Sequence, residues 1–147
     1  MTCKKIDNMR LIQFILIFTL SINVYAQSDV PEKYWLDDAS FSNIINSNSG
    51  FGDDGNETIL IEFWAEFNAE NCFADWEKIE GAKYYRVDIA NSPNIKKQYR
   101  VRMAPTLILF KNGQKQMSFK AGLDLLLPTD LAEIQESINE INNANKF

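Results

Sequence analysis

Residues 58–64 read Thr-Ile-Leu-Ile-Glu-Phe-Trp, the most hydrophobic stretch of the chain beyond its first 26 residues. The run is short and rich in β-branched and aromatic side chains, which predicts a strand covered on both faces. One acid, Glu62, interrupts it. Because a buried carboxylate needs a partner, we expect Glu62 to be satisfied by Arg86, by Lys120 or by water, with an ion pair as the expected form.

Strand and helix patterns alternate on both sides of this segment. Further strands are expected at residues 33–36, 84–89, 106–110 and 116–120, the last two joined by a hairpin turn at Lys111-Asn112-Gly113. Helices are expected from Asp37 or Asp38, over residues 69–80, from Pro93, and from Pro128-Thr129-Asp130. This alternation predicts a single domain of the α/β class.

The first 26 residues have the pattern of a secretory signal. A positively charged start precedes the apolar run Leu11–Val24, and Val24-Tyr25-Ala26 offers a small-residue cleavage site. The run is shorter than the roughly 20 residues of a spanning helix. We therefore expect a signal peptide at residues 1–26 and an exported, periplasmic domain at residues 27–147, with no permanent membrane span once the signal is removed.

Composition excludes several classes of function. Histidine is absent among the 147 residues, which rules out triads and metal sites that need imidazole. Removing residues 1–26 takes away three of 15 basic and one of 20 acidic residues, which leaves a net charge of −7 and argues against a nucleic-acid partner. The acids of residues 47–57 lack the spacing of a calcium loop, so no metal and no cofactor are expected.

Several strings, in order and at near-family spacing, resemble the thioredoxin family. They are Leu36–Phe41, Ile61–Glu66, Val87-Asp88, Ser92-Pro93, Gln98-Tyr99, Ala104-Pro105-Thr106, Phe110–Gly113 and Gly122. The resemblance covers residues 36–141 and implies a three-layer α/β thioredoxin fold, in which helices flank a central mixed sheet of four or five strands.

The chain departs from the family where the redox chemistry resides. Thioredoxins carry Cys-x-x-Cys at a helix N-terminus, where one thiolate attacks a disulfide and the second thiol resolves the intermediate. Here the string is Phe67-Asn68-Ala69-Glu70-Asn71-Cys72. An ungapped alignment puts Asn68 and Asn71 at the thiol positions. Since Cys72 and three apolar residues after it follow helical spacing, we favour a shift by one, which puts Ala69 at the attacking position and Cys72 at the resolving one.

Neither alignment supplies an attacking thiol, so a dithiol cycle is excluded. The only other cysteine is Cys3, within the expected signal. We interpret Cys72 as a small buried residue on a helix face. The alternatives are a monothiol exchanger, in which the resemblance gives Glu62 the role of a proton shuttle, and a Cys72-linked dimer. Asn68 is expected to cap the helix over residues 69–80.

Pro105 resembles the family's cis-proline, beside which the backbone of Ala104 would pair with an extended substrate. Such a groove needs no cysteine. Its expected members are Trp64, Phe67, Asn68, Ala69, Asn71, Ala104, Pro105 and Thr106. The expected function is therefore a non-catalytic module that binds a protein or an extended peptide. The alternative is a monothiol thiol-disulfide oxidoreductase that uses Cys72 in redox homeostasis.

Two surface features remain. Tyr84-Tyr85, Trp35 and Phe51 could form a partner surface, although strand aromatics usually belong to a core. Lys96-Lys97 with Arg100 and Arg102 form a basic patch, which we interpret as a solvated helix face.

Overall fold

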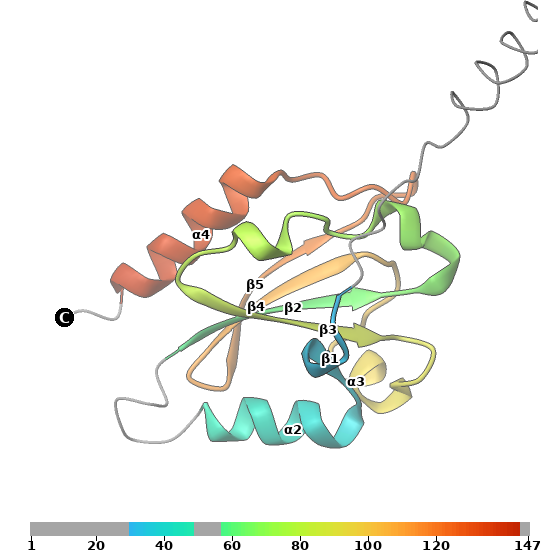
Figure 1. Ribbon diagram of the computed structural model, residues 1–147, viewed down its shortest axis with the longest axis horizontal. Helices are drawn as coiled ribbons and strands as arrows, with labels where there is room; N and C mark the ends of the chain where they lie inside the picture. Colours follow the sequence, from blue (N-terminus) through green and yellow to red (C-terminus); the bar gives the residue numbers. More distant parts are fainter. Residues whose placement is uncertain (1–29, 49–56, 145–147) are drawn as a thin grey trace, which may run out of the picture.

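The computed structural model describes residues 30–48 and 57–144 (Figure 1). The expected signal peptide, its cleavage site, Cys3 and Phe51 lie outside these residues.

A five-stranded mixed sheet forms the centre of the domain. Its strands are β1 (Trp35–Leu36), β2 (Thr58–Trp64), β3 (Ala82–Asp88), β4 (Thr106–Lys111) and β5 (Gln114–Lys120). They lie in the order β1-β3-β2-β4-β5. Strands β1, β3 and β2 are parallel, whereas β4 runs antiparallel to β2 and β5 antiparallel to β4. The apolar run at residues 58–64 is thus a central strand, as its composition predicts.

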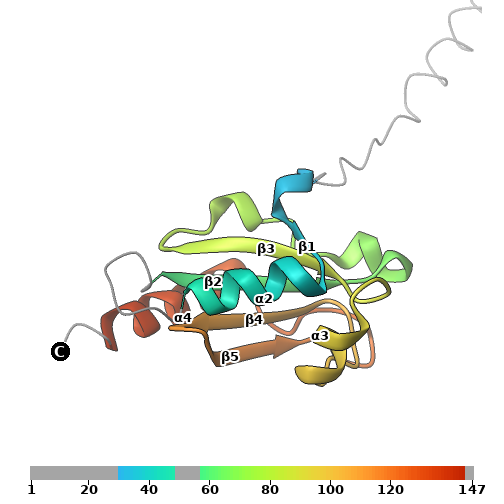
Figure 2. The same cartoon turned by 90° about the horizontal axis from the view of Figure 1, so that it is seen from below.

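Helices cover the two faces of the sheet and create two separate cores (Figures 1 and 2). On one face, α2 (Asp38–Ser47) and α3 (Pro93–Gln98) pack on the odd-numbered residues of β2, such as Ile61. On the other, α4 (Leu131–Ala144) packs on the even-numbered ones, such as Leu60. Alternate side chains of a strand point to opposite faces, so the apolar run serves both cores. The expected three-layer thioredoxin fold is confirmed.

Local capping explains where the helices begin. The Asp37 carboxylate accepts a hydrogen bond from the Ser40 backbone N–H at 2.7 Å, and the Ser40 hydroxyl accepts one from the Asp37 N–H at 2.9 Å. This capping box fixes the first turn of α2. The Asp130 carboxylate likewise accepts from the Glu133 N–H at 3.0 Å at the start of α4. Both helix starts were predicted from the sequence.

The prediction of a helix over residues 69–80 is wrong. Two short 3₁₀ segments take its place, η3 (Glu66–Asn71) and η4 (Trp76–Lys78), and Cys72 between them has an extended backbone with φ −63° and ψ 162°. Phe73 lies between the two segments and Trp76 begins η4, so both aromatic side chains are buried without a continuous helix. The first strand is also shorter than expected, because Glu32–Tyr34 forms a 3₁₀ turn, η1.

Within residues 30–48 and 57–144, the helices are too short or too polar to span a bilayer. The same residues contain no group of three or more acidic or cysteine side chains placed to hold a metal ion.

Candidate functional site

The site forms where η3 meets the loop before β4 and the loop between β5 and α4. The peptide bond between Ala104 and Pro105 is cis. The Asn68 side-chain Nδ2 donates hydrogen bonds to the carbonyl oxygens of Ala104 and Leu125, each at 2.8 Å. Asn71 Nδ2 donates in turn to Asn68 Oδ1 at 2.6 Å. One buried amide therefore ties three segments together.

Asn68 is not the helix cap that its position suggests. It lies within η3, with a non-helical φ of −130°, and its side chain is only 4% exposed. A capping side chain would accept from a nearby backbone N–H. This amide instead donates to two distant carbonyls, so the predicted capping role is wrong.

The contacts also bear on the two alignments. The alignment that places Ala69 and Cys72 at the two thiol positions assumes a helix over residues 69–80. The structure has two short 3₁₀ segments there instead. The side chains of Asn68 and Asn71, which the ungapped alignment equates with the two thiols, contact each other beside the cis-proline loop. The geometry therefore favours the ungapped alignment.

The expected groove residues come together only in part. Asn68, Asn71 and Ala104 share direct contacts, but Ala104 is 1% exposed and its carbonyl already accepts the Asn68 amide. These contacts disfavour the strand-like pairing expected at Ala104. Trp64 packs edge-on against Trp35, with ring centroids 5.2 Å apart, at the β1 side of the sheet.

The remaining members lie on the proline loop or in η3. Pro105 and Thr106 are buried, with the Pro105 carbonyl accepting from the Ala121 N–H at 3.0 Å and the Thr106 hydroxyl donating to the Met103 carbonyl at 2.7 Å. Ala69 is half-buried. The groove is thus largely a packed junction.

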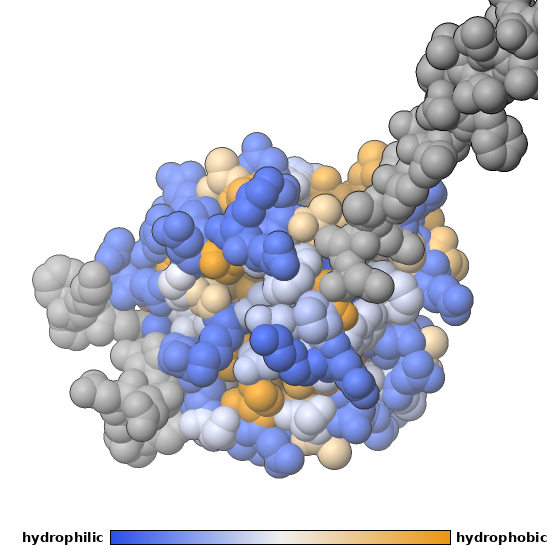
Figure 3. All heavy atoms as spheres, viewed as in Figure 1, coloured by the Kyte–Doolittle hydropathy of each residue, from blue (hydrophilic) through white to orange (hydrophobic). Residues whose placement is uncertain are grey.

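Exposed apolar side chains surround this junction. Phe67 beside Asn68 is 72% exposed, and Leu123 and Leu126 beside Leu125 are 98% and 49% exposed. We call these three side chains the apolar rim. Figure 3 shows apolar residues reaching the surface at the upper right, where the loop from β5 to α4 runs in Figure 1. Neither Leu123 nor Leu126 was among the residues expected at the site, although the apolar run at residues 125–127 in a loop was a signal for Leu126.

Below the site, Glu62 has partners for both carboxylate oxygens. Its Oε1 accepts from the Phe73 backbone N–H at 2.9 Å. Its Oε2 accepts from the Tyr84 hydroxyl and from Arg86 Nε at 3.0 Å, and Arg86 Nη2 lies 2.8 Å away as an ion pair. The expected ion pair is confirmed with Arg86. Since both oxygens are occupied, Glu62 is held as a structural anchor for the Phe73 backbone.

Burial and the charges of Glu62 and Arg86 shift the pKa values of Cys72, Tyr84 and Arg86. Burial, reinforced by the Glu62 charge, raises the pKa of the Cys72 thiol, with Arg86 opposing the shift. Burial and Glu62 also raise the pKa of Tyr84 far above its usual value. Burial acts to lower the pKa of Arg86, but the charge of Glu62 and the contact with Tyr84 outweigh it, so the Arg86 pKa is raised.

Cys72 itself is half-buried and belongs to neither core cluster. The interpretation of Cys72 as a core residue is therefore wrong. The physical reason is the extended backbone at residue 72, which ends η3 before the chain turns Phe73 into the core. The raised pKa disfavours the thiolate form of Cys72, and the described residues contain no second thiol.

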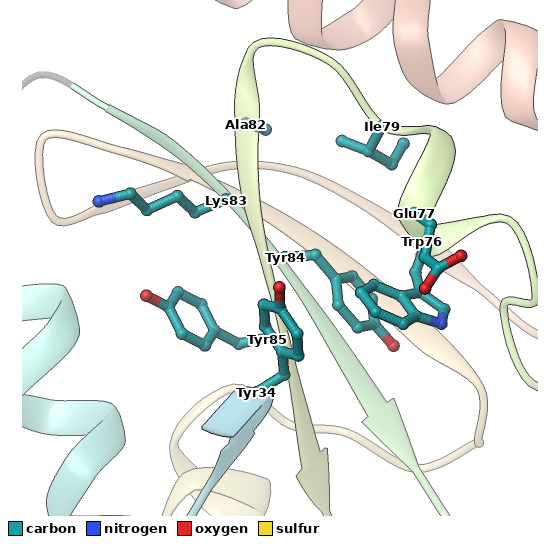
Figure 4. A pocket seen from close by; sticks show the side chains of 8 residues that line it. All are labelled: Tyr34, Trp76, Glu77, Ile79, Ala82, Lys83, Tyr84 and Tyr85. Atoms are coloured by element: carbon teal, nitrogen blue, oxygen red, sulfur yellow. The ribbon is translucent and has the colours of Figure 1, made fainter. Parts of the chain in front are cut away.

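Apart from this site, a hollow of about 420 Å³ lies beside β3, between η1 and η4 (Figure 4). The Trp76 ring packs on the rings of Tyr34 and Tyr84, with centroids 5.0 and 5.4 Å apart. Tyr84 is 5% exposed. It therefore belongs to the core, and the suggestion that Tyr84 and Tyr85 together form a partner surface is wrong.

A mixed sheet flanked by helices, with a cis-proline loop packed against the segment that follows β2, defines the thioredoxin-fold class. The chain matches the thioredoxin family over residues 32–126. It belongs to the thioredoxin family.

Relatives and solved structures agree with this assignment. The chain is 29% identical to a thioredoxin of Malassezia sympodialis over 94 residues, which are 58% of this chain and 83% of that protein. It is 33% identical to a thioredoxin of Rickettsia felis over 72 residues, 44% of this chain and 68% of that one. The crystal structure of the Malassezia sympodialis thioredoxin covers 74% of this chain and 89% of its own at 21% identity, with a TM-score of 0.55. A Schistosoma mansoni thioredoxin covers 73% and 95% at 17% identity, with a TM-score of 0.56.

Proposed function

We propose that this protein is an exported, non-catalytic thioredoxin-family module that binds a segment of a partner protein at the apolar rim. The observation that carries the proposal is the Asn68 amide. At the position that the ungapped alignment assigns to the attacking thiol, it is committed to the carbonyls of Ala104 and Leu125. A side chain held in this way stabilises three loops and offers no sulfur.

The rim supports binding in the absence of redox chemistry. Exposed apolar side chains that gather around one junction are typical of interaction sites. Phe67, Leu123 and Leu126 are carried by two segments that the Asn68 amide holds together. The rim is therefore pre-ordered, which lowers the entropic cost of docking a partner.

The chemistry of Cys72 disfavours the monothiol alternative. Exchange needs a thiolate, and the pKa of Cys72 is raised by burial and by Glu62. If the thiolate did attack a disulfide, the mixed disulfide would need an external thiol for release. We therefore assign Cys72 no part in binding.

Two measurements on the purified protein test this proposal. The first is reduction of insulin disulfides by dithiothreitol, which we expect the protein not to accelerate. The second is an NMR titration with the cysteine-free peptide Ac-(Leu-Gln)₃-NH₂, in which the amide signals of Phe67, Leu123 and Leu126 should shift. Cys72→Ser should bind the peptide equally well.

Matched variants locate the binding. Phe67→Ser and Leu123→Ser should weaken peptide binding, whereas Met117→Ser, at an exposed apolar residue on β5, should not. Catalytic insulin reduction, or binding that disappears in Cys72→Ser, would favour the monothiol exchanger and overturn the proposal.

A further inference from the structure

A hollow of about 310 Å³ lies beside the proline loop and is lined by three basic side chains, Arg100, Arg102 and Lys120, together with Met103 and Ala121. Residues 100–103 come from the loop between α3 and β4, whereas Lys120 and Ala121 come from the end of β5. Residues about 20 positions apart thus meet around one concavity. We call it the basic hollow.

Within the described part of the chain, no ion pair is formed by any of the three cations of the basic hollow. Among the described residues, ion pairs join Lys78 to Asp75, Lys83 to Glu57 and Arg86 to Glu62, and none involves the hollow. Asp124, the nearest acid along the chain from Lys120, turns its carboxylate to the Leu126 N–H at 3.1 Å.

Among the described residues, no acidic residue lines the basic hollow. The chain has 20 acidic and 15 basic residues, so charge balance would place acids beside most cations. Like charges around a concavity repel one another and raise the local positive potential. A site of this kind gains most from an anionic ligand.

The structure divides the basic patch expected from the sequence. Lys96 and Lys97 are exposed on α3 and do not line the hollow, in keeping with a solvated helix face. Arg100 and Arg102 instead join Lys120, which no local pattern could show. Arg100 also has a φ of 53°, in the left-handed region that favours glycine.

The hollow adjoins the candidate site through the proline loop. Met103 directly precedes Ala104, and its carbonyl accepts the Thr106 hydroxyl. Lys120 is the register partner of Thr106, and the Ala121 N–H donates to the Pro105 carbonyl at 3.0 Å. Residues 103–106 therefore connect the basic hollow with the junction that the apolar rim surrounds.

We infer that the basic hollow binds acidic side chains of the protein segment that docks on the apolar rim. The inference rests on the proposed function and adds the chemistry of the partner: apolar side chains for the rim and carboxylates for the hollow. The arginine guanidinium groups can donate paired hydrogen bonds to a carboxylate. Exposed charge pairs of this kind contribute modestly to affinity and strongly to selectivity.

The test compares Ac-(Leu-Glu)₃-NH₂ with Ac-(Leu-Gln)₃-NH₂ by isothermal titration calorimetry at low ionic strength. We expect the acidic peptide to bind about fivefold or more tightly, with the difference shrinking as salt is added. Arg102→Gln/Lys120→Gln should remove the preference and leave affinity for the neutral peptide unchanged. Lys96→Gln/Lys97→Gln, which changes the net charge equally, should keep the preference.

Arg100→Gly separates binding from folding. Glycine relieves the left-handed backbone at residue 100, so this variant should be at least as stable as the parent while it loses part of the preference.

The outcomes are distinguishable. Equal affinities for the two peptides, or a preference that persists in Arg102→Gln/Lys120→Gln, overturn this inference and leave the proposed function in place. Failure of both peptides to bind overturns the proposed function together with the inference.

Discussion

The Asn68 side-chain amide donates to the carbonyl oxygens of Ala104 and Leu125, which lie 36 and 57 residues further along the chain. Both bonds are 2.8 Å long and the side chain is buried. Asn68, which the ungapped alignment equates with a thiol of the Cys-x-x-Cys motif, thus joins three segments of the fold. The chain has the thioredoxin fold and carries no Cys-x-x-Cys motif.

The first prediction concerns this cross-link. Asn68→Ala removes both hydrogen bonds and leaves two carbonyls without their donor, so it should lower the free energy of unfolding by about 2–3 kcal/mol. Urea denaturation measures the effect. Asn143→Ala, at an exposed position of α4, is the control and should change stability by less than about 0.5 kcal/mol. Equal stability of Asn68→Ala and the parent would show that the cross-link contributes nothing.

A second prediction decides between the two alignments with introduced thiols. Because the Asn68 and Asn71 side chains contact each other at 2.6 Å, Asn68→Cys/Asn71→Cys in a Cys72→Ser background should form an internal disulfide with oxidised glutathione as oxidant. Ala69→Cys with native Cys72 should not form one. Mass spectrometry after alkylation counts the free thiols. The opposite result would support the alignment shifted by one residue.

The buried ion pair gives a third prediction. Arg86→Met leaves the Glu62 carboxylate buried without its cation and should cost about 3–5 kcal/mol of stability. In Glu62→Gln/Arg86→Met, the glutamine can still accept from the Phe73 N–H and bond to Tyr84, so the double variant should be at least about 2 kcal/mol more stable than Arg86→Met alone. A strictly additive double variant in urea denaturation would contradict the coupling.

The fourth prediction follows from the raised pKa of Cys72. Its ordinary value is 9.0, so at pH 7 the folded protein should be less than about 1% thiolate. Alkylation by iodoacetamide should therefore be slow at pH 7 and rise about tenfold per pH unit up to pH 9, without a plateau. Glu62→Gln should speed the reaction at a given pH, because the Glu62 charge contributes to the raised pKa.

The sign for stability follows from the same shift. A thiol whose pKa is raised on folding favours the protonated, folded form, so its contribution is present below the unfolded-state pKa and is lost as pH rises through the folded-state value. An alkylation plateau below pH 8 would show a lowered pKa and would favour the monothiol exchanger.

Much of the fold could be predicted because its signals are local. The run at residues 58–64 marks the central strand by composition, and Asp37 and Asp130 mark helix starts by capping. The segment over residues 69–80 could not be predicted, because its helical spacing competes with contacts made elsewhere. The Phe73 N–H donates to Glu62. Asn68, directly before the segment, donates to the carbonyls of Ala104 and Leu125. All three acceptors lie outside residues 69–80.

For the candidate site, the residue types could be predicted from the sequence, whereas the contacts that those residues make required the structure. The two cysteines of the chain are Cys3 and Cys72, so the lack of a Cys-x-x-Cys motif is a property of the sequence alone and does not depend on folding. The need of Glu62 for a cation followed equally from the cost of burying a charge. The tertiary structure alone decided that Asn68 joins three loops, that Cys72 is half-buried, and that Lys120 meets Arg100 and Arg102. These three features depend on distances between residues that are far apart in the chain. Such distances are set by tertiary packing and cannot be read from the order of residues.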